Sequence, residues 1–164
     1  MAFVFGYGSL AVPGAGRPLR LAGWRRVWGV AMDNRVTIPG YKYFLDGAGG
    51  RPAVCVGFLD VVPDPAAWVD GVVFEVAELG GLDARERNYA RVDVSGALER
   101  DLGGPVWAYT GLREARERFA AGPTVVSRAY LESVRAAFAA HGLGFDPEPA
   151  PGLPVLDLER IDVV

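Results

Sequence analysis

The hydrophobic pattern of this chain is a series of short apolar runs interrupted by glycine and proline, which is typical of β-strands joined by turns. Five runs predict strands, at residues 2–5, 53–61, 68–76, 89–94 and 105–109. A further stretch, residues 19–34, mixes apolar positions with arginines around Trp24 and Trp28, which predicts one long bent strand or two short ones. The prolines of Pro63-Asp64-Pro65 separate two of the runs, because proline cannot donate to a β-ladder. The chain is therefore rich in strands.

Two segments have the spacing of helices. Residues 124–140 carry Tyr130, Val134 and Phe138 four positions apart, which places the three side chains on one helical face. Residues 79–88 predict a second helix, which is short and rich in arginine. Helices are thus few beside the many strands.

The remaining segments are expected to be irregular or extended. Residues 12–18 and 39–52 contain several glycines and prolines and predict loops, and the proline-rich residues 146–154 are expected to wrap the surface. Residues 155–164 predict a last strand or an extended tail. The whole pattern favours an α+β fold, with a small curled mixed sheet or β-barrel and a few short helices, in a single domain over residues 1–164.

A glycine-containing turn, Gly6-Tyr7-Gly8-Ser9-Leu10, follows the first predicted strand. Glycines at Gly6 and Gly8 allow positive φ and remove Cβ atoms that would block a ligand. Such a turn can direct successive main-chain N–H groups at one anion. The spacing up to Ala11 also matches a dinucleotide-binding fingerprint, but the prolines and glycines that follow exclude the helix that this fingerprint requires. An ordinary tight turn between strands is the remaining alternative.

Glu86 interrupts an otherwise apolar helical face. If the second helix includes Leu79, then Leu79, Leu82 and Glu86 point to the same side, toward the core. Burial raises the pKa of a carboxyl group, which suits a residue that accepts a proton and returns it. The alternative is a capping box, because Asp83 and Glu86 have its spacing and Glu86 would then bind the Asp83 N–H. Pairing with the flanking arginines would also keep Glu86 in solvent.

Composition excludes several classes of function. A net charge of −3 gives no electrostatic footprint for nucleic acid. The single cysteine, Cys55, and the single histidine, His141, argue against a disulfide framework and a zinc site. His141 lies at an expected helix end, so Ser9 lacks an evident base and is better explained as a hydrogen-bond donor than as a nucleophile. No leader pattern or apolar run of membrane length is present, so we expect a cytoplasmic protein without a membrane partner.

Three segments resemble the γ-glutamylcyclotransferase-like superfamily, which includes the ChaC group and the plant avirulence-induced group. Val4-Phe5-Gly6-Tyr7-Gly8-Ser9-Leu10 resembles its opening signature. Leu82-Asp83-Ala84-Arg85-Glu86, followed by Tyr89-Ala90-Arg91-Val92, resembles the segment that bears its catalytic glutamate. Trp107-Ala108-Tyr109 resembles its late strand, whose tyrosine borders the pocket. Arg87 departs from this pattern, because it replaces the glycine that follows the glutamate.

The resemblance implies an enzyme that cyclises a γ-glutamyl compound to 5-oxoproline and releases an amine or amino acid. Because the α-amine of the substrate attacks its own γ-carbonyl, the reaction needs no cofactor and no nucleophile from the protein. Glu86 is implied as the catalytic residue that takes the proton from the amine and gives it to the departing nitrogen. The implied substrate-binding residues are Tyr7, Gly8, Ser9, Leu10, Tyr89 and Tyr109. For the last two, a role as core tyrosines bonded to the backbone is equally open.

Two other classes of function use the same residues: a non-catalytic module that binds a small carboxylate, and a hydrolase of γ-glutamyl amides in which water is the nucleophile. A glutamate that faces a cavity favours catalysis, whereas a capping glutamate favours binding. The leaving group cannot be read from the sequence. The aromatic residues Tyr41, Tyr43 and Phe44, if exposed, would shape the leaving-group side or form an oligomer contact.

Overall fold

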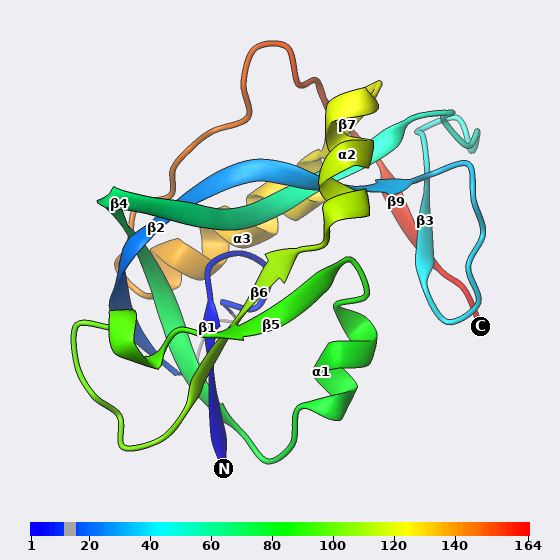
Figure 1. The fold of residues 1–164 in the computed structure, drawn as a ribbon. Helices are drawn as coiled ribbons and strands as arrows, with labels where there is room; N and C mark the ends of the chain where they lie inside the picture. Colours follow the sequence, from blue (N-terminus) through cyan, green and yellow to red (C-terminus); the bar gives the residue numbers. More distant parts are fainter. Residues whose placement is uncertain (12–15) are drawn as a thin grey trace.

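Two long antiparallel strands organise the fold. In the computed structural model, which describes residues 1–11 and 16–164, β2 (Arg17–Asp33) pairs with β4 (Cys55–Val76). The register of this pair shifts on either side of Gly23 and of Gly29, and such bulges bend a strand and increase its twist. Figure 1 shows the result as a curved ribbon that crosses the molecule. Residues 19–34 thus form one long bent strand, as one of the two sequence predictions stated.

The two strands expected at residues 53–61 and 68–76 are joined into one element, β4. The predicted break is nevertheless present in the pairing of β4 with β2. Trp24 pairs with Pro63 and Ala22 with Trp68, so residues 64–67 have no partners in β2. The expected irregular segment at residues 12–18 lies largely outside the described residues, and its last two residues begin β2.

The other strands complete a seven-stranded mixed sheet. β1 (Ala2–Gly6) is antiparallel to β4 and parallel to β6 (Val106–Gly111), and β5 (Tyr89–Asp93) is antiparallel to β6. On the other side of β4, β7 (Thr124–Ser127) and β8 (Val155–Leu156) add two parallel pairings. The order is β5-β6-β1-β4-β7-β8, with β2 also paired to β4. The expected α+β class, with a curled mixed sheet, is confirmed.

A separate two-stranded sheet lies beside this main sheet. β3 (Lys42–Leu45) is antiparallel to β9 (Glu159–Asp162), and Figure 1 shows the pair next to the C-terminus. The prediction of a loop throughout residues 39–52 is therefore wrong at β3. The glycines around this strand favour a loop prediction, and its partner, β9, lies near the C-terminus.

Helix α3 (Arg128–Ala140) carries the face that its spacing predicts, with Val134 and Phe138 fully buried. It begins four residues later than expected, because the β-branched run before Ser127 forms β7. Ser127 then ends the strand and caps the helix, since its hydroxyl accepts a hydrogen bond from the Tyr130 N–H at 3.4 Å.

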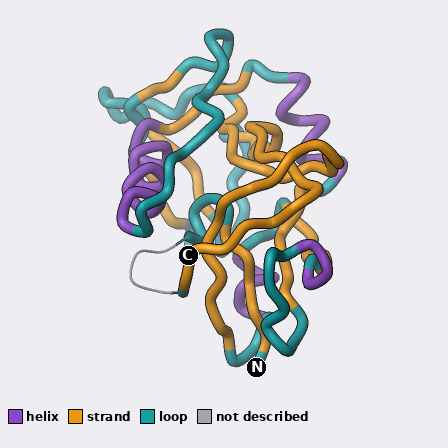
Figure 2. The backbone as a smooth tube through the Cα atoms, turned by 90° about the vertical axis from the view of Figure 1, so that its left-hand side faces the viewer, coloured by secondary structure: helices purple, strands orange, loops and turns teal. Residues whose placement is uncertain are grey.

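The remaining helical segments are short: α1 (Gly80–Arg85), the 3₁₀ turn η1 (Ser95–Ala97) and α2 (Arg113–Ala121). Sequence reasoning missed α2, whose only buried side chain is Ala115, so its pattern has no apolar stripe. In Figure 2 the helices lie around the long strands, which curl across the molecule.

The main core fills the concave side of the sheet, where α3 packs. Val134 and Phe138 of α3 belong to one buried cluster with Phe5 of β1 and Leu59 of β4. This packing brings the end of β1 and the turn that follows it against β4 and α3. Among the described residues, no helix is both long and apolar enough to span a membrane.

Candidate active site

The glycine turn lies where β1 ends, and its path depends on close contacts of the main chain. A Cβ on Gly6 would lie 2.7 Å from the carbonyl carbon of Leu10 and 2.9 Å from the Ala11 nitrogen, so this position tolerates only glycine. A Cβ on Gly8 would come within 3.3 Å of Leu59. Neither glycine has a positive φ, so the expectation of left-handed conformations in this turn is wrong. The two glycines serve close approach instead.

The turn leaves main-chain donors available. The Ala11 N–H closes the turn by donating to the Gly8 carbonyl at 2.9 Å. By contrast, the N–H groups of Gly8, Ser9 and Leu10 donate to no residue that the structure describes. Unpaired main-chain donors close together on a turn form a site suited to an anion.

Two buried side-chain groups hold the turn in place. Arg26, whose residue is only 6% exposed, donates from Nε to the Tyr7 carbonyl at 2.8 Å. The Tyr7 hydroxyl donates in turn to the carbonyl of Tyr109 on β6. Burial and the nearby carboxyl of Asp60 raise the pKa of Tyr7 well above its ordinary value, so its hydroxyl stays a donor at neutral pH.

Glu86 follows the last residue of helix α1 and lines a cavity together with the glycine turn. Its N–H donates to the carbonyl of Leu82 at 2.8 Å, and no side chain caps the start of the helix at Leu79. The capping-box alternative is therefore wrong. The argument from a shared helical face also fails, because α1 buries none of its residues.

The environment of the Glu86 carboxyl group favours its neutral form. The side chain is 14% exposed, and burial raises its pKa above the ordinary value of 4.5. The positive charges of Arg85, Lys42 and Arg160 oppose this rise. Arg85 lies closest, with Nε 3.7 Å from Oε1, which is a loose ion pair. The Glu86 carboxylate is thus largely buried and more basic than a carboxylate in water.

A small cavity, here called the inner cavity, lies between Glu86 and the glycine turn. Its volume is about 30 Å³. It is lined by Phe5, Tyr7, Gly8, Ser9, Leu10, Leu59, Glu86, Tyr89, Tyr109 and Tyr130. The structure therefore brings together all seven site residues that the sequence and the family resemblance suggested, although they come from three separate segments.

The hydroxyl groups of the two tyrosines expected to line the pocket are already hydrogen-bonded to the protein. Tyr89 donates to the Leu59 carbonyl at 2.7 Å, and Tyr109 donates to Asp83 Oδ1 at 2.8 Å. Arg91 donates from Nε to the same carboxylate at 2.9 Å. Tyr89 and Tyr109 thus line the cavity with their rings while their hydroxyls tie β5 and β6 to β4 and α1.

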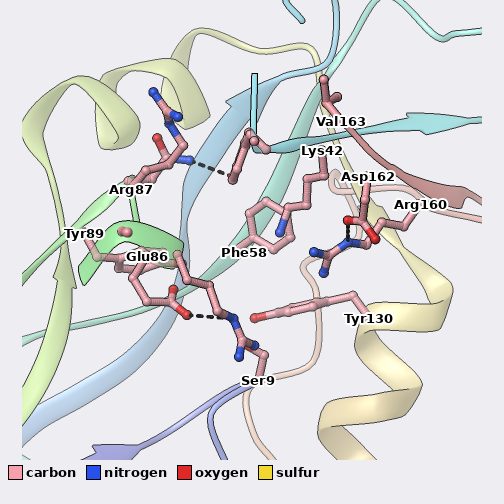
Figure 3. Close-up of a pocket in the computed structure, with 15 residues that line it drawn as sticks. Ser9, Lys42, Phe58, Glu86, Arg87, Tyr89, Tyr130, Arg160, Asp162 and Val163 are labelled. Atoms are coloured by element: carbon pink, nitrogen blue, oxygen red, sulfur yellow. Dashed lines mark hydrogen bonds and ion pairs between the residues drawn. The ribbon is translucent and has the colours of Figure 1, made fainter. Parts of the chain in front are cut away.

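A larger space, here called the outer cavity, adjoins the inner one and measures about 390 Å³. The two share Ser9, Glu86, Tyr89 and Tyr130. The outer cavity is also lined by Tyr41, Lys42, Phe58, Arg85, Arg87, Arg160 and Asp162, among others. Figure 3 shows Glu86 on one side of this space and, across from it, Tyr130 together with Lys42 and Arg160 of the β3–β9 sheet.

Sequence reasoning missed three residues of the site. Tyr130 was taken as part of the core face of α3, and its side chain lines both cavities together with Glu86. Lys42 is the only lysine of the chain, a signal that gave no role by itself. Arg160 has no local signal, because its position depends on the pairing of β3 with β9. Among described residues, no group of three or more His, Cys, Asp or Glu is placed to bind a metal.

Comparison with known proteins relates this geometry to one fold. A solved structure named gamma-glutamyl cyclotransferase superposes with a TM-score of 0.55 and 17% identity, over 93% of this chain and 92% of that one. An uncharacterized protein from Homo sapiens superposes with a TM-score of 0.55 and 18% identity, over 93% and 92%. No family model and no curated protein sequence matches the chain. The chain has the γ-glutamylcyclotransferase-like fold, and the resemblance noted in the sequence is confirmed at the level of the fold.

Proposed function

We propose that the protein is a γ-glutamylcyclotransferase-type enzyme, which cyclises a γ-glutamyl compound to 5-oxoproline and releases an amine or amino acid. One observation carries the proposal: the largely buried Glu86 lines the same cavity as Gly8, Ser9 and Leu10, whose N–H groups have no acceptor among the described residues. The γ-glutamylcyclotransferase-like fold supports it.

The inner cavity has room for one small polar group. A volume of about 30 Å³ corresponds to roughly two water molecules, and therefore to the two oxygens of a carboxylate. The N–H groups of Gly8, Ser9 and Leu10 supply the donors that such a group needs. The α-carboxylate of the substrate would bind there, which would place its α-amine beside Glu86 and its γ-amide at the mouth of the outer cavity.

Glu86 would carry one proton through the reaction. It would take a proton from the α-ammonium group, and the free amine would then attack the γ-carbonyl carbon. A ring C–N bond forms and the ring nitrogen, which still carries two hydrogens, gives its second proton to solvent. The amide C–N bond then breaks, and the proton on Glu86 goes to the departing nitrogen. The products are 5-oxoproline and a free amine, and no oxidant or external nucleophile takes part.

The raised pKa of Glu86 suits this role, because a base whose pKa is nearer neutrality both accepts and returns a proton readily. Positioned proton transfer contributes about 10²–10⁴-fold in rate. Holding the amine against the carbonyl adds several kcal/mol, about the effect of a high effective concentration.

Product analysis tests the proposal. The protein is incubated with γ-glutamyl amino acids, a γ-glutamyl peptide and γ-glutamylamines, and 5-oxoproline and glutamate are measured separately. We expect 5-oxoproline and the free amine in equal amounts. Glutamate in place of 5-oxoproline would instead identify a hydrolase, and binding without turnover would identify a carboxylate-binding module.

A further inference from the structure

The outer cavity is unusually basic for an acidic chain. Four cationic side chains line it, against two carboxylates, whereas the chain as a whole has a net charge of −3. Its cations are Lys42, Arg85, Arg87 and Arg160, and its carboxylates are Glu86 and Asp162. The surplus of positive charge inside a concave site favours an anionic ligand.

Most of these charges already have a partner within the protein. Arg160 Nε lies 2.8 Å from Asp162 Oδ1, and Arg85 forms the loose pair with Glu86. Arg87 lies with its guanidinium carbon 5.3 Å from the centre of the Tyr41 ring. These partners, Asp162, Glu86 and Tyr41, themselves line the outer cavity.

Lys42, like Arg87, has aromatic partners and no carboxylate partner among the described residues. Its ammonium group has no hydrogen bond or ion pair with any residue that the structure describes. Instead it lies 4.5 Å from the centre of the Phe58 ring and 5.3 Å from that of Tyr41. Aromatic faces stabilise a cation but leave its N–H groups without acceptors. A half-buried ammonium group that points into a cavity and lacks an acceptor suits a ligand that supplies one.

The β3–β9 sheet sets the position of Lys42 relative to Arg160. Lys42 is paired with Asp162, and Phe44 with Arg160, so Lys42 and Arg160 lie diagonally on one face of the sheet. Phe44 is buried on that face and fixes it against the core. The two cations therefore belong to a rigid element.

We propose that the outer cavity is a leaving-group subsite in which Lys42, assisted by Arg160, binds a carboxylate carried by the departing amine. The substrates are then γ-glutamyl derivatives of amino acids or peptides rather than of simple amines. This inference rests on the proposed function. It follows from the arrangement of the two cavities, because Glu86 lines both of them and places the reacting amide at their junction. The group on the amide nitrogen then extends toward Lys42.

The ionisation of Lys42 agrees with this role. Burial, together with the neighbouring charges of Arg160 and Arg85, lowers its pKa to about 8 against the opposing charges of Glu86 and Asp162. A bound carboxylate would stabilise the charged form and raise this pKa again.

A matched pair of substrates tests the subsite. γ-Glutamylalanine and γ-glutamylethylamine differ only in the carboxylate of the leaving amine. We expect kcat/KM of the wild-type protein to favour γ-glutamylalanine by about 10- to 100-fold, the range of one charged hydrogen bond. In Lys42→Met this preference falls toward one, and in Lys42→Arg most of it is retained. The exposed Arg100 provides the control, because Arg100→Gln also removes one positive charge and keeps the preference.

Binding separates failure of the subsite from failure of the proposed function. Calorimetry with Glu86→Gln compares the two compounds without turnover, and the same comparison is made with Lys42→Met added. Tighter binding of γ-glutamylalanine that depends on Lys42 supports the subsite even if no 5-oxoproline forms. Equal kcat/KM and equal affinity for the two compounds, or a preference that survives Lys42→Met, overturns it.

Discussion

Burial shifts the pKa values of two ionisable side chains of the site, Glu86 and Lys42. It raises the pKa of Glu86 and lowers the pKa of Lys42, so it favours the neutral form of each. The two groups also attract one another, which partly restores both charges. Such perturbed groups around a shared cavity are frequent at functional sites. At the scale of single residues, the pKa values of Glu86 and Lys42 are therefore both shifted toward neutral pH, where each group exchanges its proton more readily.

The raised pKa of Glu86 predicts a pH dependence of stability. Because its folded pKa lies above the unfolded value, the stability that Glu86 contributes is fully present below the unfolded pKa and is lost as pH rises through the folded pKa. At neutral pH the ionised group is thus a net cost. We expect Glu86→Gln to raise the Tm at pH 7 and to change it less at pH 4, as measured by thermal unfolding at both values.

Glu132→Gln is the matched control, because Glu132 is exposed on α3. Its effect on Tm should be small at both pH values. A lower Tm for Glu86→Gln at pH 7 would contradict the assignment of Glu86 as a desolvated carboxylate.

The same raised pKa predicts the acid limb of activity. Glu86 must be ionised to accept a proton, so kcat/KM should fall as pH decreases through its pKa, at a pH above the ordinary 4.5 of a glutamate. The measurement is a pH–rate profile for 5-oxoproline formation, with protein recovered at neutral pH to exclude unfolding. A profile that is flat down to pH 4 would contradict the role of Glu86.

At the scale of elements, the glycine turn depends on a single buried arginine. Arg26 of β2 donates to the carbonyl groups of Tyr7, Asp70 and Asp146, so it ties the turn to β4 and to the proline-rich segment. Burial lowers its pKa to about 10, which still leaves it charged at neutral pH. Its guanidinium also lies 4.6 Å from the centre of the Phe138 ring. One side chain thus joins three segments behind the proposed anion site.

Arg26→Met is predicted to lower the free energy of unfolding by about 2–4 kcal/mol, because it removes a buried charged donor from the Tyr7 carbonyl and from two part-buried carbonyls. Urea unfolding measures this change. Arg25→Met is the control, since Arg25 is 55% exposed and its ion pair with Asp64 is at the surface, where such pairs contribute about 1 kcal/mol or less. Equal effects of the two substitutions would show that Arg26 does not hold the turn.

At the scale of the whole molecule, the sequence predicted the strands and the helix whose formation depends on local sequence pattern. The apolar runs located β1, β5 and β6, and the four-residue spacing located α3. The glycine turn was predicted because Gly6 has no room for a side chain, and this constraint is visible in the sequence as a glycine. Glu86 was selected by family resemblance, whereas the argument from a helical face reached the same residue through a helix that ends before it.

The rest of the molecule depends on contacts between distant segments. β3 and β9 are far apart in the sequence, and neither short run predicts the other. Their pairing places Lys42 and Arg160 at the outer cavity, so no local signal could assign them. Helix α2 is likewise set by packing against the β2–β4 ribbon. Most residues of the inner cavity were thus predictable from the sequence, whereas Tyr41 was suggested for the outer cavity and Lys42 and Arg160 were not.

The rate of 5-oxoproline release by Glu86→Gln, compared with wild type and Glu132→Gln under identical conditions, is the most direct test of the central claim. Glutamine keeps the size and hydrogen bonding of Glu86 but cannot act as the base. We predict a loss of ~10²–10⁴-fold for Glu86→Gln with an unchanged circular dichroism spectrum, and no loss for the control. Wild-type turnover in the folded Glu86→Gln protein would contradict the account.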